Sequence, residues 1–398
     1  MPRWDRDVWL LLASRGVRSV AGGALGVITS LYLRYALHLS LTEIGIFFGV
    51  GAFLAPLLSL VFGRLGDRYS RKAVLLLTLS FLPIATAILL ATSSYPLLLL
   101  AAALGGFGTA GALASGSVGA VAAPVQTAIL ADKTEGLDRS FVYAVFNLVS
   151  GVSSALGALL ANLSYREAFL IALALSAASL AVVLPIREPI GRRGADNGRP
   201  ALSAKELAYI RRFAAVGALN GTAQGLVTSF LPIIFKQMLY VPNGVVGDIF
   251  FVGGLAAAFA SLAAPWFSRI LGLRDAIIAL RVISTAALML IPFSASLPMA
   301  IATYVAYVMF RVSSLAPQQA LMMELVGRGS RSTATGINQA ARLFPSALAT
   351  TAAGAMLDYL PIPVPFSIAV AINLANIALY KKYFPNPRPA QVGAAALE

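Results

Sequence analysis

Long apolar runs constrain this chain more than any other feature of its sequence. Runs of about twenty mostly apolar residues recur along all 398 residues, and a helix of that length crosses the ~30 Å hydrocarbon layer of a membrane. Charged residues make up only 12% of the chain and the mean hydropathy is +0.82, whereas soluble domains carry about 25% charged residues. The sequence therefore predicts an all-helical integral membrane protein.

Charged residues and Pro or Gly breaks separate twelve of these runs. The first run is too long for a signal peptide and lacks a cleavage site of small residues, so we expect it to be a membrane span. The twelve predicted spans lie at roughly 7–33, 41–62, 73–92, 96–131, 140–163, 168–186, 206–235, 243–267, 273–293, 298–325, 331–357 and 363–384.

Lys and Arg are distributed unevenly between the loops on the two sides of these spans. The side that holds both termini carries 22 of them, and the opposite side carries only Arg34, Arg166 and Lys236. Because basic loops remain on the cytoplasmic side, the sequence predicts a multi-pass protein of the cytoplasmic membrane with both termini in the cytoplasm.

The two halves of the chain repeat one another at a shared offset. A shift of 202 residues pairs Arg34 with Lys236, together with Gly, Phe and Pro positions around them. The offset falls to 192–193 after the Gly/Ala/Ser-rich run at 105–123, where close helix packing or a local break is expected. Two such repeats are typical of transporters that bind substrate near the membrane midplane. The predicted units are an N-terminal six-helix bundle at 1–189, a cytoplasmic linker at 190–204, a C-terminal six-helix bundle at 205–384, and a tail at 385–398 whose end resembles a vector scar.

One loop carries the most specific motif. Between the second and third runs the chain reads Gly63-Arg-Leu-Gly-Asp67-Arg68-Tyr-Ser-Arg71-Lys72. This stretch resembles the cytoplasmic loop signature of the major facilitator superfamily, which has a Gly, then Asp-Arg, then a basic pair. With the twelve runs and the repeat, the resemblance covers nearly the whole chain. It implies the major facilitator fold and secondary transport by alternating access.

The same loop is predicted to act as a conformational latch. A carboxylate at Asp67 can bind the N-terminus of a neighbouring helix, where free N–H groups favour an anion, and the resemblance implies that the eleventh span is that neighbour. The alternative is a solvated loop that only marks the cytoplasmic side. The predicted latch comprises Gly63, Asp67, Arg68, Arg71, Asp132 and Glu324.

Arginines lie deep within several apolar runs. At 1.5 Å per residue, Arg15, Arg18, Arg311 and Arg342 fall roughly 13–20 Å from the ends of their runs, near the middle of the layer, and no acidic residue lies at comparable depth. Arg281 is only about 10 Å from Arg274, so we expect it to extend to the cytoplasmic surface and leave it out of the site.

Polar residues gather on one face of the spans that carry these arginines, which predicts a water-filled cavity. An arginine at mid-membrane costs about 2.5–3.5 kcal/mol and normally faces a cavity or a partner. Guanidinium groups bind carboxylates and phosphates with two parallel hydrogen bonds, so we expect a small anionic substrate. The predicted substrate-binding residues are Arg15, Arg18, Asn220, Gln224, Tyr307, Arg311, Asn338 and Arg342.

A structural role for some of these arginines stays open. Arg15, Arg18 and Arg342 can instead form gate ion pairs with acids such as Asp132 or Glu324. Export of lipophilic drugs or lipids is an alternative transport function. Proton-coupled drug antiporters of the superfamily that the chain resembles usually have a basic residue in span 4 and a proline in span 5. Here span 4 has no basic residue and Gly151–Leu160 has no proline.

Other classes of function are disfavoured by what the sequence lacks. It has no cysteine and only one histidine, so disulfides, metal sites and Ser-His catalysis are not expected, and neither is a cofactor; a membrane receptor or enzyme is a remote alternative. The net charge of +14 is spread over the ends of the spans, which argues against nucleic-acid binding. We expect a monomer surrounded by membrane lipids. Because anion uptake opposes the membrane potential, exchange or efflux is favoured over proton symport.

Overall fold

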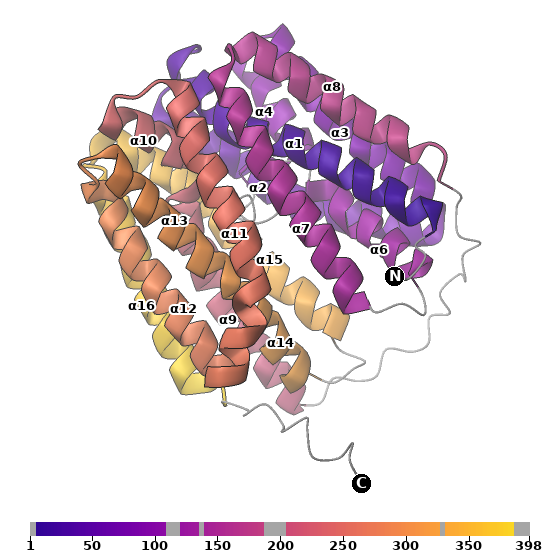
Figure 1. Cartoon of the computed structure of the whole chain (residues 1–398), viewed down its shortest axis with the longest axis vertical. Coiled ribbons are helices and arrows are strands. Elements are labelled where there is room, and N and C mark those ends of the chain that lie inside the picture. Colours follow the sequence, from indigo (N-terminus) through magenta and orange to yellow (C-terminus); the bar gives the residue numbers. More distant parts are fainter. Residues whose placement is uncertain (1–4, 109–119, 135–138, 187–203, 327–330, 386–398) are drawn as a thin grey trace.

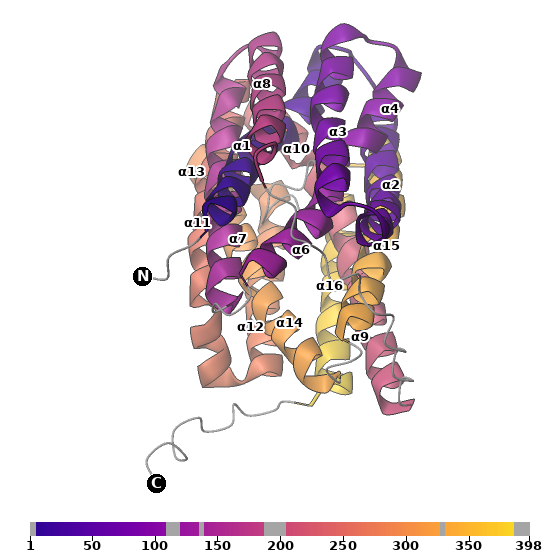
Figure 2. The ribbon, with the colours of Figure 1, turned by 90° about the vertical axis from the view of Figure 1, so that its right-hand side faces the viewer.

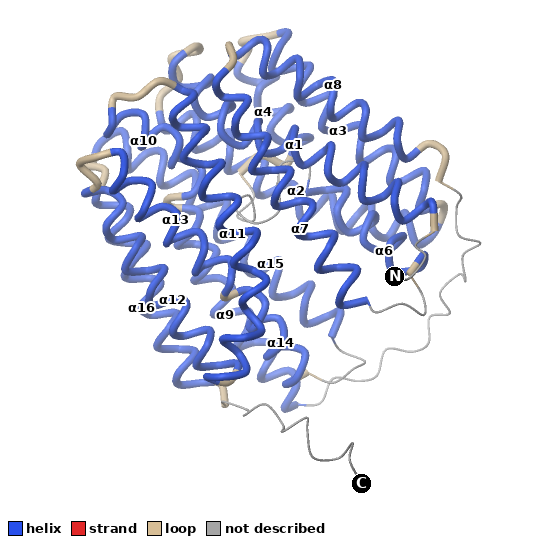
Figure 3. The backbone as a smooth tube through the Cα atoms, viewed as in Figure 1, coloured by secondary structure: helices blue, strands red, loops and turns tan. Residues whose placement is uncertain are grey.

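Every regular element of the computed structural model is helical over the residues that it describes, which are 5–108, 120–134, 139–186, 204–326 and 331–385 (Figure 3). Hydrocarbon offers no water to the backbone, so helices, which satisfy their backbone groups internally, are the expected elements. Ten helical segments in these ranges are long and apolar enough to cross a membrane. The predicted all-helical membrane class is therefore confirmed.

The helices fall into two successive groups along the chain (Figure 1). The first group comprises α1 (Arg6–Tyr35), α2 (Leu41–Arg68), α3 (Arg71–Ala91), α4 (Tyr95–Gly105), η1 (Ala120–Ala122), α6 (Ala123–Lys133), α7 (Arg139–Ala158), η2 (Leu159–Asn162) and α8 (Tyr165–Val183). The second comprises α9 (Ala204–Gly225), η3 (Thr228–Phe230), α10 (Leu231–Leu239), α11 (Asn243–Leu271), α12 (Leu273–Leu290), η4 (Ile291–Phe293), α13 (Leu297–Ser313), α14 (Leu315–Leu325), α15 (Arg331–Tyr359) and α16 (Pro363–Tyr383).

Three predicted spans are interrupted helices rather than continuous ones. The run 96–131 becomes α4 and α6, since Gly106 adopts a left-handed conformation (φ 62°) that ends α4. The runs 206–235 and 298–325 likewise become α9 with α10, and α13 with α14. Hydropathy alone does not reveal such breaks, because both pieces of each run are apolar. The predicted linker lies outside the described residues, except for Ala204, where α9 begins.

The helix starts reproduce the internal repeat. The starts of α2, α3 and α4 recur 202 residues later in α11, α12 and α13. The starts of α6 and α7 recur 192 residues later in α14 and α15. The change of offset therefore falls between the starts of α4 and α6, a stretch that contains the run where the sequence predicts it.

The motif-bearing loop is shorter than predicted. Helix α2 continues through Gly63 and Asp67 and ends at Arg68, and α3 begins at Arg71. Only Tyr69 and Ser70 connect the two helices, and the Ser70 hydroxyl caps α3 by accepting a hydrogen bond from the Ala73 amide at 3.1 Å. Helix α2 extends past the end of the apolar run, because no residue that would end the helix occurs before this cap.

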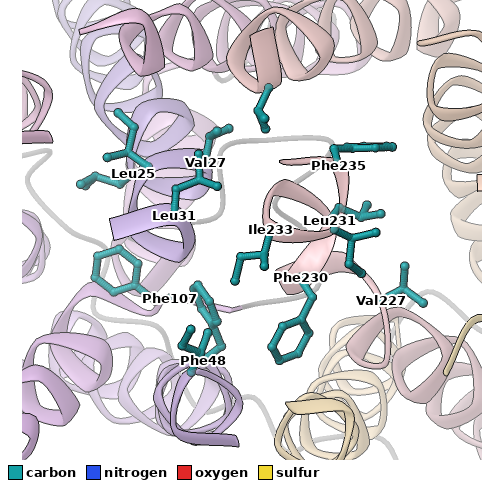
Figure 4. Packing of buried hydrophobic residues seen from close by; sticks show 14 of the residues in the cluster. Leu25, Val27, Leu31, Phe48, Phe107, Val227, Phe230, Leu231, Ile233 and Phe235 are labelled. Carbon is teal, nitrogen blue, oxygen red and sulfur yellow. The ribbon is translucent and has the colours of Figure 1, made fainter. Parts of the chain in front are cut away.

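The apolar core joins the two helix groups at one side of the molecule only. We call the side where α1 begins and α16 ends the terminus side, and the opposite side the far side. One cluster of buried residues draws on both groups, including Leu31 of α1 and Phe230 and Phe235 near α10 (Figure 4). The other two clusters lie toward the terminus side, one around Leu11 in the first group and one around Phe213 in the second. Each bundle thus has its own core there. Figures 1 and 2 show the two groups of helices that carry these cores.

Glycines allow the two bundles to meet at the far side. A Cβ on Gly354 of α15 would lie 2.2 Å from the Leu41 carbonyl oxygen of α2, and one on Gly45 would lie 2.9 Å from the Thr350 carbonyl oxygen. On the other flank, a Cβ on Gly247 of α11 would lie 2.5 Å from the Ala158 carbonyl oxygen. These backbone approaches leave no room for a side chain, so the far side is closed.

A carboxylate of one bundle caps a helix of the other at this closed side. Asp358, in the last turn of α15, accepts hydrogen bonds from the Leu41 amide (3.0 Å), the Thr42 amide (2.8 Å) and the Thr42 hydroxyl (2.7 Å) at the start of α2. An anion at a helix N-terminus is favoured by the free N–H groups and the helix dipole. This is the arrangement that the sequence predicts for Asp67 and the eleventh span, but it involves the opposite ends of the same two helices.

Candidate substrate-binding site

A polar pocket lies within the second bundle. Its walls come from α9, α12, α13, α14 and α16, and its lining contains two arginines and no acid. The pocket offers about 10 Å³ to a water-sized sphere, which is room for one water, so a larger ligand requires its side chains to move. The lining residues are Asn220, Arg281, Ser284, Thr285, Tyr307, Arg311, Ser314, Leu315 and Asn373.

Arg281 is part of this pocket, which corrects its exclusion from the predicted site. Its side chain is buried (7% exposed), donates to Asn376 Oδ1 and donates to Gln318 Oε1 at 2.6 Å. The guanidinium also lies 4.7 Å from the centre of the Tyr380 ring. Distance along the helix alone suggested that Arg281 extends to the surface, but neighbouring helices supply partners that hold it inside the bundle.

Arg311 lies beside Arg281 but has no comparable hydrogen-bond partners in the part of the chain that the structure describes. It is 9% exposed, and its guanidinium lies 6.0 Å from the centre of the Tyr307 ring. The two guanidinium groups are close enough to interact electrostatically. Within the described ranges, neither arginine forms an ion pair with a carboxylate. The structure thus brings together Asn220, Tyr307 and Arg311, three residues that the sequence places in one site.

Helix α15 brings two more predicted residues against α9. A Cβ on Gly217 of α9 would lie 2.6 Å from Asn338 Oδ1. A Cβ on Gly221, one turn further along α9, would lie 1.9 Å from the Arg342 carbonyl oxygen. Arg342 donates to Gln339 Oε1 at 3.1 Å and interacts electrostatically with Arg311. Its Nε is buried and has no hydrogen-bond partner among the described residues. Three cationic side chains, Arg281, Arg311 and Arg342, therefore lie in the second bundle without an ion pair to any described acid.

Gln224 differs from the other buried amides. It is 2% exposed, and neither its Nε2 nor its Oε1 has a hydrogen-bond partner in the part of the chain that the structure describes. Buried polar groups normally have at least one partner. Gln224 lies four residues after Asn220 and therefore on the same face of α9, one turn beyond the pocket.

The predicted residues of the first bundle have partners there. Arg18, 3% exposed, donates to Gln126 Oε1 of α6 at 3.2 Å, and Gln126 in turn donates to the Leu11 carbonyl oxygen at 3.2 Å. Arg15 lies 5.1 Å from the centre of the Phe146 ring of α7. Neither arginine lines the pocket that contains Arg311, so the structure does not unite the eight predicted residues in one site. Sequence reasoning missed Gln126, whose depth in a predicted span was the available signal.

The predicted latch residues lie at the terminus side. Glu324 is exposed on α14, and Arg68 is exposed with its guanidinium 5.7 Å from the Tyr69 ring centre. Nothing lies within 4 Å of a Cβ built on Gly63. Arg71 begins α3, while the side chains of Asp67 and Asp132 fall outside what the structure describes. The latch therefore stays a prediction.

Comparison with known proteins identifies a family at the level of sequence. The model of the Major Facilitator Superfamily matches residues 11–350 and, in a second match, residues 213–398. None of the curated proteins compared with the chain matches it.

Solved structures resemble the whole chain at low sequence identity. A mutant of the nucleoside transporter NupG superposes with a TM-score of 0.79 at 12% identity, covering 96% of this chain and 100% of that one. A bacterial homolog of the human lysosomal transporter Spinster, inward-facing and occupied, gives 0.74 at 16% identity over 94% and 95% of the two chains. The human organic anion transporter MFSD10 gives 0.64 at 19% identity over 96% and 100%. At these identities the likeness shows the fold alone.

Proposed function

The chain belongs to the major facilitator superfamily, and from that premise we propose that it is a secondary transporter of a small anion in the cytoplasmic membrane. One observation carries the anion preference: Arg281 and Arg311 are buried in one pocket, the partly buried Arg342 interacts electrostatically with Arg311, and none of the three forms an ion pair with any described acid. Cations in a low-dielectric interior repel one another and are costly without compensating charge. A carboxylate or phosphate provides that charge with matching geometry.

The proposal also includes alternating access. The bundles share a core and direct contacts at the far side, and they have separate cores toward the terminus side. Such an arrangement favours entry of a substrate from the terminus side, which we assign to the cytoplasm from the distribution of Lys and Arg. Exchange of one anion for another is the favoured coupling, because moving a negative charge into the cell costs about 2.3 kcal/mol per 100 mV.

Ligand-dependent melting of the purified protein tests the substrate class. A ligand that binds only the folded protein raises its melting temperature. Phosphate, sulfate and succinate are expected to do so in a saturable manner, at constant ionic strength, while a neutral sugar and a lipophilic cation are not. Stabilisation by the lipophilic cation but by none of the anions would instead favour drug export.

Single cysteines test the orientation, which is a prediction of the loop charges. The chain has no native cysteine, so each label reports one position. Cysteine at Pro361, an exposed residue of the far side, is expected to react with an impermeant maleimide added to intact cells. Cysteine at Lys382, in the last turn of α16, is expected to react only after the cells are opened. The reverse pattern would overturn the cytoplasmic assignment.

The two ends of α2 and α15 are expected to act as opposed latches. Asp358→Asn removes a charge from an exposed site and should weaken far-side closure by about 1 kcal/mol, or roughly fivefold. Asp67→Asn should weaken closure of the terminus side by about 1–2 kcal/mol. Distances between spin labels at Leu163 and Leu360, and at Leu184 and Ile270, are expected to shift in opposite directions for the two variants. Shifts in the same direction would exclude paired latches.

A further inference from the structure

Beyond the polar pocket, α9 carries a buried amide of different chemistry. Asn220 lines the pocket with the two arginines, and Gln224 lies on the same helix face roughly 6 Å further toward the far side. Both amide atoms of Gln224 are buried and have no hydrogen-bond partner among the described residues. A buried amide in this state is costly unless a ligand or water binds it.

The fold supplies partners to the comparable buried amides nearby. Asn376 accepts from Arg281 and donates to the Val216 carbonyl oxygen at 2.6 Å, and Gln318 accepts from Arg281. Gln126 in the first bundle both accepts and donates. Gln224 therefore differs from these three amides, because neither its Nε2 nor its Oε1 has a hydrogen-bond partner among the described residues. This difference indicates that a bound ligand supplies the missing partner.

Two hydroxyl groups are likewise buried without a hydrogen-bond partner among the described residues. The Thr228 Oγ1 atom, in η3 at the break between α9 and α10, is buried without a hydrogen-bond partner in the described chain. Helix α1 of the first bundle contacts η3, and its Thr29 is 0% exposed with its Oγ1 in the same state. Gln224 and Thr228 thus provide uncharged groups beyond the arginines that can both donate and accept hydrogen bonds, and Thr29 lies on a first-bundle helix that contacts η3.

We propose that the substrate is a hydroxylated organic anion that uses both regions. Its carboxylate or phosphate binds in the pocket of Arg281 and Arg311, and its hydroxyl groups bind Gln224 and Thr228, since a hydroxyl can donate and accept as those groups require. This inference rests on the proposed anion transport and narrows its substrate class. An unsubstituted alkyl anion would leave the amide and hydroxyl groups unpartnered, and sites with buried polar groups reject such analogues strongly.

Two matched pairs of ligands test the proposal on the purified full-length protein. D-gluconate is compared with hexanoate, and glycerol 3-phosphate with propyl phosphate, by ligand-dependent melting at constant ionic strength. At least one hydroxylated member is expected to bind tenfold or more tightly than its unsubstituted partner. Equal binding within both pairs would overturn the hydroxyl preference but leave anion transport standing. Failure of all four ligands and of inorganic phosphate to stabilise the protein would count against both.

Variants locate the preference in the protein. Gln224→Leu and the isosteric Thr228→Val are each expected to reduce the preference to threefold or less while keeping the response to inorganic phosphate. Neither should lower the melting temperature of the ligand-free protein, because each removes an unpartnered polar group. Thr86→Val is the matched control, since Thr86 is buried in α3 with its hydroxyl bonded to the Leu82 carbonyl oxygen at 2.9 Å, and it should retain the full preference. Retention of the preference in both Gln224→Leu and Thr228→Val would overturn the proposal.

Discussion

Arg311→Gln is expected to weaken binding of the transported anion about 30- to 150-fold, because a buried charge-assisted contact contributes on the order of 2–3 kcal/mol. The ligand-free protein should remain as stable as the wild type or become slightly more stable. The Arg311 guanidinium lies near Tyr307 and neighbouring arginines and is not paired with a described acid. The substitution therefore removes repulsion between cations and leaves no acid uncompensated. Melting temperatures with and without anion measure both effects.

Two further variants provide the comparison. Arg281→Gln is expected to lower the melting temperature of the ligand-free protein, because Asn376 and Gln318 each lose a donor. Arg269→Gln removes an exposed charge near the end of α11 and should change neither property. If Arg311 instead formed a gate ion pair with an acid, its substitution would leave that acid uncompensated and destabilise the ligand-free protein. A lower stability of ligand-free Arg311→Gln with anion-induced stabilisation intact would end the assignment of this arginine to the anion site.

Gly354→Ala is expected to open the far side without unfolding the protein. The added Cβ would lie 2.2 Å from the Leu41 carbonyl oxygen of the opposite bundle, a contact that only separation of the bundles relieves. Overpacking of this kind costs about 1–3 kcal/mol, so the ratio of far-side-open to far-side-closed molecules should rise up to roughly 150-fold. Longer distances between spin labels at Leu163 and Leu360 would report the change.

Two other glycines make the result specific. Gly336 lies on the same helix with nothing within 4 Å of a Cβ, so Gly336→Ala should leave the distances unchanged and stabilise α15 by about 0.5–1 kcal/mol. In Gly221→Ala the Cβ would lie 1.9 Å from the Arg342 carbonyl oxygen within one bundle, so that variant should lose about 3 kcal/mol of folding stability. If Gly354→Ala instead lowers the melting temperature as much as Gly221→Ala, with unchanged distances, the two bundles do not separate at this contact.

The large-scale organisation of the protein is determined by local sequence. Apolar runs, their lengths and their repeat predict the spans and the repeated helix starts, because transfer into hydrocarbon depends on the residues of each segment itself. Arginines in the middle of such runs, such as Arg311, are also predicted to be buried for this reason. The motif from Gly63 to Lys72 resembles the loop signature of the same family that the sequence comparison identifies.

Only the tertiary structure determined which buried polar groups have hydrogen-bond partners and which do not. Depth along a helix suggested a surface position for Arg281, but Asn376 and Gln318, 95 and 37 residues away in sequence, hold it inside. Asp358 caps a helix whose first residues lie more than 300 positions away in the sequence. Gln224 is distinguished from its satisfied neighbours by the absence of partners among the described residues. Hydropathy is a property of a single segment, but a hydrogen bond depends on which other segment lies opposite, and packing of the helices determines that.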